Sequence, residues 1–422
     1  MKVLVVLHDA LGGRGGIAKF NRDLLRGLCS APECTEIVAL PRVCPIDPVS
    51  IADLLKGQEK PQETGAFSNK LSYHLPVPRG FVRYAVTLWW KLLTHAKFDL
   101  LIMGHVNLLP FLHLLKFVPP QKRPKQIGLI LHGVEALTPI PWRTTPALLR
   151  QLDWFAAVSR WTSDKFQFWA QLDPKKAIIL PNSVDITRFS PGEANQNLAA
   201  RYNLLGKRVL MGMGRLDSRE RYKGFDEVLD ALPDLLIETP NLIYMIVGDG
   251  PEGYNDRFRL QQKAAKLGLR QHVIFTGWID EAAKIDHYRL ADVFLLCGWG
   301  EGFGIVLIEA MACGIPAIAS VLDGSIEAVQ PTLNAEQPGA VVTANRPDPP
   351  KSPHFAEFGW LANPKIPGEL TAAIREALAQ KRPFVPSGLD YFSEGKYDER
   401  VRHLIINRGA AVSPPKDKKR GA

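Results

Sequence analysis

The chain has 422 residues, of which 46% are hydrophobic, and the usual ~100–200 residues per domain predicts two domains with separate cores. No segment has the ~18–20 consecutive apolar residues of a membrane span. The apolar run after Lys2 stops at His8, too early for a secretory signal, so we expect a cytoplasmic protein. The five cysteines include no C-x-x-C pair, which argues against a disulfide framework and a zinc site and predicts reduced, packed thiols.

The positive charge belongs to the N-terminal half, because residues 1–190 have a net charge of +10 and residues 191–422 a net charge of −1. It gathers in the basic run 116–125 and in the aromatic-rich run 81–93, where Arg83, Thr87 and Lys91 form one helical stripe. Anionic lipid attracts each such cation by ~1 kcal/mol, so an anionic membrane surface is a candidate partner of the N-terminal domain. A core-packed helix with a solvated edge is the alternative for residues 81–93. Nucleic acid is not expected as a partner, because no stacking or groove-reading motif accompanies the charge.

Apolar runs alternate with helical segments throughout the chain, which predicts two doubly wound parallel sheets of the α/β class. Residues 181–206, which include Pro181, Pro191 and Gly192, are the predicted interdomain linker. Residues 331–367 are predicted to be an irregular surface insertion, and residues 411–422 a disordered tail. In chain order the predicted strands are 2–7, 36–40, 100–103, 127–131, 155–158 and 177–180 in the first half, then 208–213, 242–247, 273–276, 293–296, 316–319 and 340–342.

A glycine-rich loop, LGGRGGIAKF, follows the first strand and opens a helix. Its glycines, Gly12, Gly13, Gly15 and Gly16, let backbone amides approach a phosphate or a sugar. A dinucleotide-binding fold is the rival interpretation. It is disfavoured because G-x-G-x-x-G is absent and because the second strand ends without the acid that would bind a ribose.

Two cations, Arg215 and Lys223, come just after a predicted strand, where open α/β sheets bind ligands. Preorganised cations at that place stabilise negative charge that develops on a ligand during a reaction. A solvated charged loop is the alternative reading of these residues. The chain has no D-x-D motif, so a pair of metal-binding carboxylates is not indicated here and no metal cofactor is expected.

Two glutamates, Glu301 and Glu309, belong to a strand, loop, helix and strand unit whose loop carries Gly302 and Gly304. A helix that starts at Gly304 presents free N–H groups and a positive dipole end to an anionic or sugar ligand. On one ideal helix the two acids would be ~80° apart, which suits separate roles better than an acid/base pair.

His132 ends a very apolar predicted strand, in LILHGVE, and His105 ends the preceding one. A lone histidine at such a position is commonly a structural residue with its hydrogen bonds satisfied. A contact to a ligand at the sheet edge is the functional alternative, with His105 the lower-ranked candidate.

Four segments in order resemble the motifs of one family of enzymes. PNSVDITRF (181–189) is similar to its linker motif, MGMGRLDSRERYKGFDEVL (211–229) to its phosphate-gripping segment and IVGDGPE (246–252) to its mid-domain turn. EGFGIVLIEAMACGIPAIAS (301–320) is similar to its E-x7-E signature. The chain thus resembles the retaining nucleotide-sugar glycosyltransferases of family 4, group 1 type. The resemblance implies the GT-B fold, in which two Rossmann-like domains face each other across a cleft.

The resemblance implies a role for the glycine loop and for the two cations. Gly15 and Gly16 would abut the diphosphate of the donor, and Arg215 and Lys223 would grip it. The inserted residues SRERY lengthen the spacing before the lysine, so one of the inserted arginines is an alternative diphosphate contact.

The resemblance also implies how the sugar and the ribose are bound. His132 would lie within reach of a hydroxyl of the transferred sugar, and Glu301 beside the sugar's hydroxyls and its reacting face. Glu309 would bind the nucleotide ribose. Phe303 and Gly304 would supply backbone amides near the donor.

The predicted organisation is an acceptor-side domain at 1–190, a donor-binding domain at 191–395, a helix at 396–410 that returns to the first domain, and the tail. The predicted activity is metal-independent, retaining transfer of a hexose such as mannose or glucose from a nucleoside diphosphate sugar. The acceptor would be a saccharide or a lipid-linked saccharide in polysaccharide or glycolipid synthesis, at the inner face of the membrane. The alternatives are a nucleotide-sugar epimerase on the same fold and a non-catalytic nucleotide-sugar-binding subunit.

Overall fold

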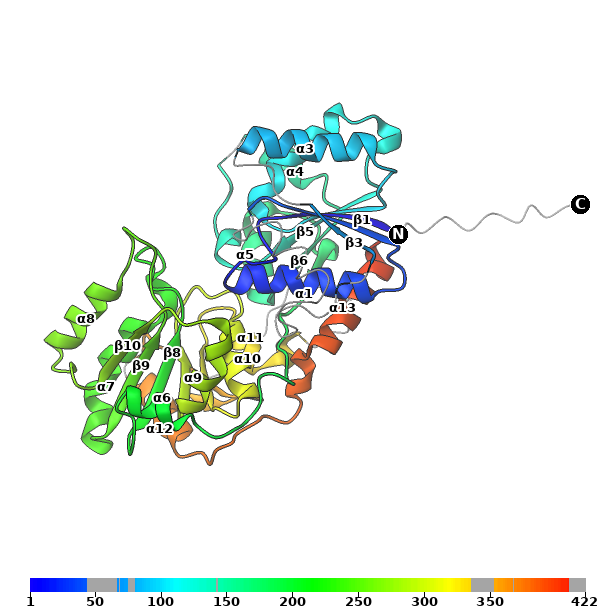
Figure 1. Cartoon of the computed structure of the whole chain (residues 1–422). Helices are drawn as coiled ribbons and strands as arrows, with labels where there is room; N and C mark the ends of the chain where they lie inside the picture. The colour runs from blue at the N-terminus through cyan, green and yellow to red at the C-terminus, as the bar shows by residue number, and fades with distance from the viewer. Residues whose placement is uncertain are drawn as a thin grey trace, which may run out of the picture.

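The structure, a computed structural model, describes residues 1–43, 67, 69–74, 80–141, 143–334, 353–366 and 368–409. It contains two seven-stranded sheets, one in each half of the chain (Figure 1). The strand order is β3-β2-β1-β4-β5-β6-β7 in the first sheet and β10-β9-β8-β11-β12-β14-β13 in the second. Both orders reverse direction at a central strand, as in doubly wound sheets, and the predicted fold class is confirmed.

All paired strands of the first sheet run parallel. Alternate residues of β1 point to opposite faces: Val3 and Val5 pack on the side of α1, whereas Leu4 and Val6 pack beneath α3 and η1. Figure 1 shows α3 and α4 on one side of this sheet and α1 on the other, and Phe166 of α5 packs on the α3 side, against Phe155 of the sheet. The strands are β1 (Lys2–Leu7), β2 (Glu36–Pro41), β3 (Leu71–Tyr73), β4 (Leu100–Met103), β5 (Gln126–Leu131), β6 (Trp154–Ala157) and β7 (Ala177–Ile179).

The helices of the first half include a long 3-10 segment, η1 (Val106–Phe117), as well as α-helices. Among the described helices, none is both long enough and apolar enough to cross a bilayer. The α-helices are α1 (Gly16–Ser30), α3 (Phe81–Thr94), α4 (Thr145–Leu149) and α5 (Arg160–Ala170), and the other 3-10 turns are η2 (Pro120–Lys122), η3 (Val134–Ala136) and η4 (Pro174–Lys176).

The second sheet is parallel except at its edge, where β13 runs antiparallel to β14. Its strands are β8 (Arg208–Met213), β9 (Leu242–Val247), β10 (Val273–Gly277), β11 (Val293–Leu296), β12 (Ala317–Ser320), β13 (His354–Phe355) and β14 (Trp360–Ala362). The helices are α6 (Gln196–Arg201), α7 (Phe225–Glu238), α8 (Arg257–Lys266), α9 (Lys284–Leu290), α10 (Ile305–Ala312), α11 (Ile326–Val329), α12 (Glu369–Leu378) and α13 (Glu394–Gly409). The 3-10 turns are η5 (Arg221–Lys223), η6 (Glu281–Ala283), η7 (Pro331–Asn334) and η8 (Leu389–Phe392).

Every predicted strand within the described residues is present, and the ends differ by one residue at most. The predicted strand 340–342 and the tail 411–422 lie outside the described residues. The prediction of an irregular insertion over 331–367 is wrong at its end, because β14 is buried and pairs with β12. A Cβ atom on Gly359 would lie 2.6 Å from the Ala317 carbonyl oxygen, so a glycine lets β14 enter the sheet.

Two connections join the halves. The segment after β7 leads through α6 to β8, and Asn195 in front of α6 contacts Asp286 of α9. The last helix, α13, lies along α1 of the first half (Figure 1). Arg26 of α1 is 2.7 Å from a Glu394 oxygen and 3.3 Å from an Asp398 oxygen. One buried apolar cluster runs from the α1 face of the first sheet into the second sheet.

The cysteines that the structure describes, Cys29, Cys34, Cys297 and Cys313, are buried, and none forms a disulfide with another of them. Burial raises the pKa of the Cys34 thiol to about 11 and that of the Cys313 thiol to about 12. Cys44 lies outside the described residues. The Cys34, Cys297 and Cys313 thiols are therefore protonated and pack as small apolar residues.

Candidate active site

The carboxyl ends of the two sheets meet at two glycine turns. Gly302 follows β11 of the second sheet, and Gly133 follows β5 of the first. A Cβ atom on Gly302 would lie 2.3 Å from the His132 carbonyl oxygen, and one on Gly133 would lie 2.9 Å from the Gly302 Cα. Gly133 also has a φ of 150°, which side chains disfavour. Only glycines permit this approach, and it brings the predicted residues Glu301 and His132 to the same junction between the domains.

His132 is held in one tautomer by the backbone of the neighbouring strand end. Its Nε2 lies 2.8 Å from the Gly104 carbonyl oxygen and must donate to it, so Nδ1 carries the lone pair that can accept a hydroxyl. The Phe20 ring meets the imidazole edge-on, with the centroids 4.9 Å apart. Burial lowers the His132 pKa although the nearby Glu135 carboxylate opposes the change, so the ring is neutral at physiological pH.

Glu135 is a residue that sequence reasoning missed. Its Oε1 accepts the backbone N–H groups of His132 and Gly133, the second at 3.1 Å, and so fixes the turn that presents the histidine. The available signal was its position three residues after His132, the spacing at which a carboxylate can accept the N–H groups of a turn.

His105 lies beside His132, with ring centroids 5.9 Å apart. Its Nδ1 accepts the Asn107 backbone N–H at 3.1 Å and caps η1. Burial is the main cause that lowers the His105 pKa to about 4. The second candidate histidine is therefore a neutral capping residue next to the first.

Glu301 and Lys223 form an ion pair across two loops of the second domain, with Nζ and Oε2 3.2 Å apart. The Glu301 backbone N–H donates to Asp323 Oδ2 at 2.9 Å. The Lys223 side chain is 14% exposed and that of Glu301 24% exposed, so both can meet a ligand while their backbones stay fixed. The structure thus brings together a predicted sugar contact and a predicted diphosphate contact.

Glu220, in the segment inserted before Lys223, contacts both predicted diphosphate ligands. It forms an ion pair with Arg215 through Nη2, and its Oε2 is 3.9 Å from Lys223 Nζ. Arg215 Nε also donates to Glu220 Oε2 at 3.3 Å. A carboxylate that engages the Arg215 fork in this way uses the N–H groups that would bind a phosphate. Glu220 was not among the predicted site residues.

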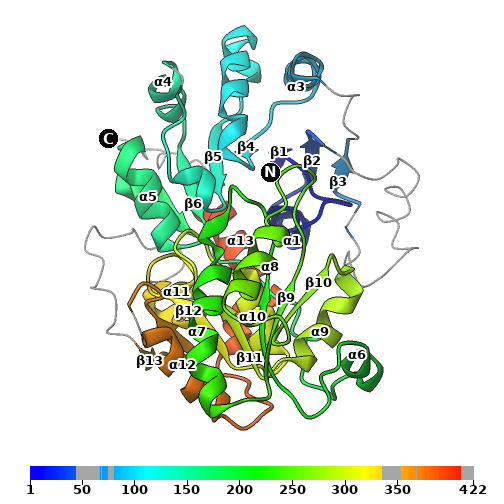
Figure 2. The ribbon, with the colours of Figure 1, turned by 90° about the vertical axis from the view of Figure 1, so that its left-hand side faces the viewer.

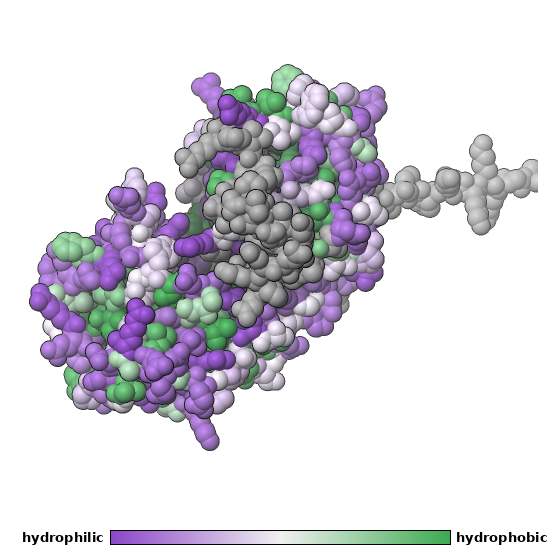
Figure 3. Space-filling view, in the orientation of Figure 1, coloured by the Kyte–Doolittle hydropathy of each residue, from purple (hydrophilic) through white to green (hydrophobic). Residues whose placement is uncertain are grey.

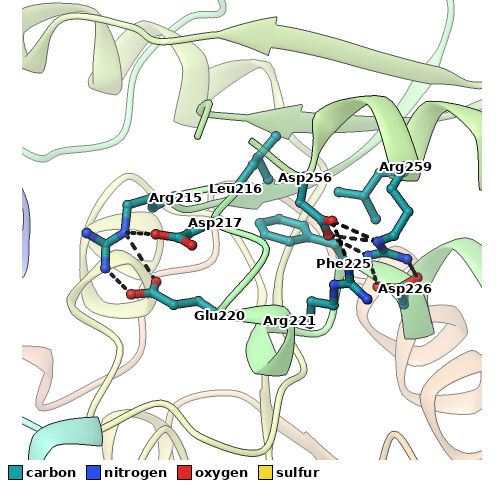
Figure 4. Close-up of a pocket in the computed structure, with 10 residues that line it drawn as sticks. Arg215, Leu216, Asp217, Glu220, Arg221, Phe225, Asp226, Asp256 and Arg259 are labelled. Carbon is teal, nitrogen blue, oxygen red and sulfur yellow. Dashed lines mark hydrogen bonds and ion pairs between the residues drawn. The ribbon is translucent and has the colours of Figure 1, made fainter. Parts of the chain in front are cut away.

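The two inserted arginines have other partners, and Figure 4 shows those of Arg221. Arg219 pairs with Asp217 at 2.6 Å and lies 4.1 Å from the centre of the Tyr254 ring. Arg221 is 3.5 Å from Asp256, which also binds Arg259. The cavity among these ion pairs has a volume of about 10 Å³, which is at the lower limit for holding one water molecule. This network braces the second domain, and Arg215 at its edge is half exposed.

Two helix N-termini face each other across the domain junction. Both α1 and α10 begin after glycines with positive φ, 88° at Gly15 and 84° at Gly304, and neither has a side-chain cap. A Cβ atom on Gly16 would lie 3.5 Å from the Ile305 side chain of α10. The glycine loop is fixed by Arg22, which donates to the Ala10 and Gly13 carbonyl oxygens at 3.0 Å. The positive ends of two helix dipoles therefore point toward one region, which suits an anion.

Glu309 is fully buried in α10. Its Oε2 accepts the Tyr288 hydroxyl at 2.7 Å, and Lys284 Nζ lies 3.4 Å from both carboxylate oxygens. Lys284 is 21% exposed and also pairs with Glu281 at 3.0 Å. The structure therefore places Lys284, which was not predicted, between solvent and the acid predicted to bind ribose.

Phe303 packs its ring against Phe392, with centroids 5.5 Å apart, and is buried. Its side chain is part of the core, so only its backbone is available to a ligand. The predicted role of Phe303 uses only its backbone amide.

Two doubly wound domains that join at the carboxyl ends of their sheets, with two glycine-capped helix N-termini at the junction, define the GT-B class. Residues 200–383 match the family described as Glycosyl transferases group 1. This region of the chain is similar to the group 1 glycosyl transferases, which supports the predicted family.

Solved structures share the fold over nearly the whole chain. The complex of Anabaena Alr3699/HepE with UDP-glucose has a TM-score of 0.65 at 18% identity and covers 96% of this chain and 100% of that one. Sucrose-phosphate synthase from Thermosynechococcus elongatus has a TM-score of 0.61 at 19% identity and covers 97% and 96%.

Curated relatives are more similar in sequence but match over shorter stretches. A GDP-mannose-dependent alpha-(1-6)-phosphatidylinositol monomannoside mannosyltransferase of Mycolicibacterium smegmatis is 35% identical over 217 residues, which cover 49% of this chain and 54% of the relative. A phosphatidyl-myo-inositol mannosyltransferase of Mycobacterium tuberculosis is 38% identical over 173 residues, 41% of each chain. The chain thus spans about half the length, or less, of these relatives.

Proposed function

We propose that this protein is a glycosyltransferase that moves a hexose from a nucleoside diphosphate sugar to a saccharide or lipid-linked acceptor in glycolipid or polysaccharide synthesis. The observation that carries the proposal is the convergence of α1, α10, Arg215 and Lys223 at the domain junction. Two uncapped helix N-termini and two cations suit a diphosphate better than any neutral ligand.

The relatives guide the choice of substrates. The name of the Mycolicibacterium smegmatis relative includes GDP-mannose and a phosphatidylinositol mannoside, whereas the HepE complex contains UDP-glucose. We propose GDP-mannose as the first donor to test and UDP-glucose as the second, with a phosphoinositide-type lipid as acceptor. A thermal-shift panel of UDP, GDP and ADP identifies the base, because a ligand at 100 times its Kd stabilises the protein by ~2.7 kcal/mol. A panel in which no nucleotide raises Tm would contradict the proposal.

We propose that transfer proceeds with retention and without a metal. The acceptor hydroxyl attacks the anomeric carbon on the face from which the diphosphate leaves, and the leaving oxygen takes the hydroxyl proton. Arg215 and Lys223 stabilise the charge that develops on the diphosphate. The sequence supports metal independence, since it has no D-x-D motif. Proton NMR of the first product reports the anomeric configuration. Activity that disappears in EDTA and returns only with Mg²⁺ would overturn the metal-free mechanism.

Two other functions remain to be separated from transfer. An epimerase on this fold would convert the donor sugar without an acceptor, and a non-catalytic subunit would bind the nucleotide without turnover. Acceptor-dependent release of the nucleoside diphosphate excludes both. Glu301, Lys223 and His132 lie at one junction and match the family's motifs, which favours the enzyme.

We also propose that the first domain docks on anionic membrane at the inner leaflet. Tyr84, Leu88 and Leu92 are the core face of α3, yet the opposite face is apolar too. Val82 is 71% exposed and Trp90 61% exposed. Figure 3 shows hydrophobic residues at the top of the molecule, where Figure 1 places α3. An outward apolar stripe is typical of an interfacial helix and costs free energy in water.

The charge beside this stripe supports the same proposal. Arg83 and Lys116 are exposed near the aromatic residues Trp90 and Phe117, and each cation adds ~1 kcal/mol of attraction to anionic lipid. Flotation with anionic vesicles at low salt should recover the protein with the lipid, and Trp90→Ser should weaken that association. Ile237→Ser, at a position of α7 that is 81% exposed, is the control. Wild-type protein that stays out of the anionic vesicle fraction would contradict membrane docking and leave the transferase proposal intact.

A further inference from the structure

Glu327 of the second domain binds the first turn of a helix in the first domain. Its Oε2 accepts the Arg160 backbone N–H at 2.7 Å, and its Oε1 accepts the Trp161 N–H at 2.9 Å. Both N–H groups open α5, whose own N-cap is Ser159. Figures 1 and 2 both place α5 directly above α11, the element that carries Glu327. Glu327 is 2% exposed, so its contact with α5 is shielded from water and from salt.

The turn that leads into α11 holds the backbone of Glu301. Asp323 Oδ2 accepts the Glu301 N–H at 2.9 Å, and the Gly324 N–H donates to the Glu301 carbonyl oxygen at 2.9 Å. The other oxygen of Asp323 accepts the Ser325 N–H at 3.0 Å and the Ser325 hydroxyl. Asp323 and Ser325 are fully buried. The backbone N–H and the carbonyl oxygen of Glu301 are therefore both held by the turn that precedes Glu327, through Asp323 and Gly324.

A second contact joins the same helix to the Glu301 loop. The Thr162 hydroxyl of α5 donates to the Gly302 carbonyl oxygen at 3.3 Å, and the Ser159 hydroxyl donates to Thr162 Oγ1 at 3.0 Å. A Cβ atom on Gly324 would lie 2.1 Å from the Gly302 carbonyl oxygen and 2.8 Å from Ser159 Oγ. Helix α5, the turn at Gly324 and the loop at Gly302 are therefore in direct contact.

We propose that Glu327 is a positioning residue that makes the geometry of Glu301 depend on the docking of the two domains. A carboxylate at a helix N-terminus gains from two N–H groups and from the dipole. When the domains separate, Glu327 loses both donors, and the turn from Asp323 to Ser325 loses its support against α5. The inference rests on the proposed transferase function, because it assigns Glu301 to the reacting sugar.

The first test is Glu327→Gln, which keeps the size of the side chain. Glutamine offers one carbonyl oxygen to one N–H and turns an NH₂ group toward the other. We expect kcat to fall about ten-fold, the effect of losing one charge-assisted hydrogen bond. The affinity for the free nucleoside diphosphate, measured by calorimetry, should stay within about two-fold, because Arg215 and Lys223 are untouched.

The matched control is Glu376→Gln. This glutamate accepts the Trp360 indole N–H at 3.2 Å, and both residues lie in the second domain. The control should keep wild-type kcat. A purely structural role for Glu327 predicts instead that nucleotide affinity and kcat fall together, and that result would overturn the proposal.

Thr162→Val tests the same coupling from the first domain and covers the case in which Glu327→Gln does not fold. The change removes the hydroxyl that donates to Gly302 and keeps the shape of the side chain. It should lower kcat several-fold with nucleotide affinity unchanged. Wild-type kcat in Thr162→Val, or in a folded Glu327→Gln, would overturn the proposal. A wild-type protein that binds no nucleotide at all would instead mean that the transferase function itself is wrong.

Discussion

Replacing Lys223 by alanine should impair turnover more than any other single change in the second domain. The Lys223 ammonium is 3.2 Å from Glu301 Oε2 and 3.9 Å from Glu220 Oε2, and its side chain is 14% exposed. A preorganised cation in such a shielded place stabilises developing negative charge by ~2.7–4 kcal/mol. Because each 1.36 kcal/mol is about a factor of ten, kcat/KM should fall about 100- to 1,000-fold.

The loss of Lys223 also leaves the Glu301 carboxylate without its ion-pair partner. Part of the activity lost in Lys223→Ala should therefore come from the unpaired Glu301. The double variant Lys223→Ala with Glu301→Ala should therefore lose less than the two single effects combined. Steady-state kinetics with the donor that the thermal-shift panel selects measures all three variants.

Lys263→Ala is the matched control for this experiment. Lys263 pairs with Asp226 at 3.2 Å and Asp230 at 2.7 Å, away from the domain junction. Its removal should leave kcat/KM within about two-fold, as expected for a partly exposed ion pair. Full activity of Lys223→Ala, or an equal loss in Lys263→Ala, would refute the assignment of Lys223 to the leaving diphosphate.

Three further changes test other parts of the site. Glu220→Gln should tighten binding of the free nucleoside diphosphate about five-fold, because it frees the Arg215 fork, and calorimetry that shows weaker binding would contradict this. Glu309→Ala should lower nucleotide affinity, whereas Glu301→Ala should spare it and reduce kcat, so equal affinity losses would show that the two roles are misassigned. Burial raises the Asp323 pKa to about 7, so the folded state favours the neutral acid and its stability falls as pH rises through that value. The Tm of wild type should therefore drop relative to Asp323→Asn between about pH 4 and 7 and level off above that range, and a constant difference would argue against this titration.

Much of the fold was predictable from local patterns. The strands β1, β4, β8, β9 and β11 are short apolar runs bounded by turns, and buried parallel strands have this signature. By contrast, β3 has three residues at a sheet edge, with one of them exposed, so it has no periodicity to detect. The strand β14 was not predicted because it has only three residues, which follow a segment rich in proline.

The site was predictable only in part, for a physical reason. Glu301, Lys223 and His132 follow strand ends, and the carboxyl ends of parallel strands meet at one edge, so their proximity follows from topology. Long-range pairs leave no local signal. Lys284 meets Glu309 across 25 positions, and Glu327 meets Arg160 across 167. The Glu220 contact to Arg215 is local, but a solvated loop gives the same sequence pattern.

The most direct test of the central claim is a transfer assay with the whole chain, a panel of nucleoside diphosphate sugars and a phosphoinositide-type lipid acceptor. Mass spectrometry of the lipid and release of the nucleoside diphosphate are measured together. We expect one donor to give an acceptor that is heavier by one hexose, with nucleotide release that depends on the acceptor and is lost in Lys223→Ala. Interconversion of the donor sugar without an acceptor, or nucleotide binding without any turnover across the panel, would contradict the account.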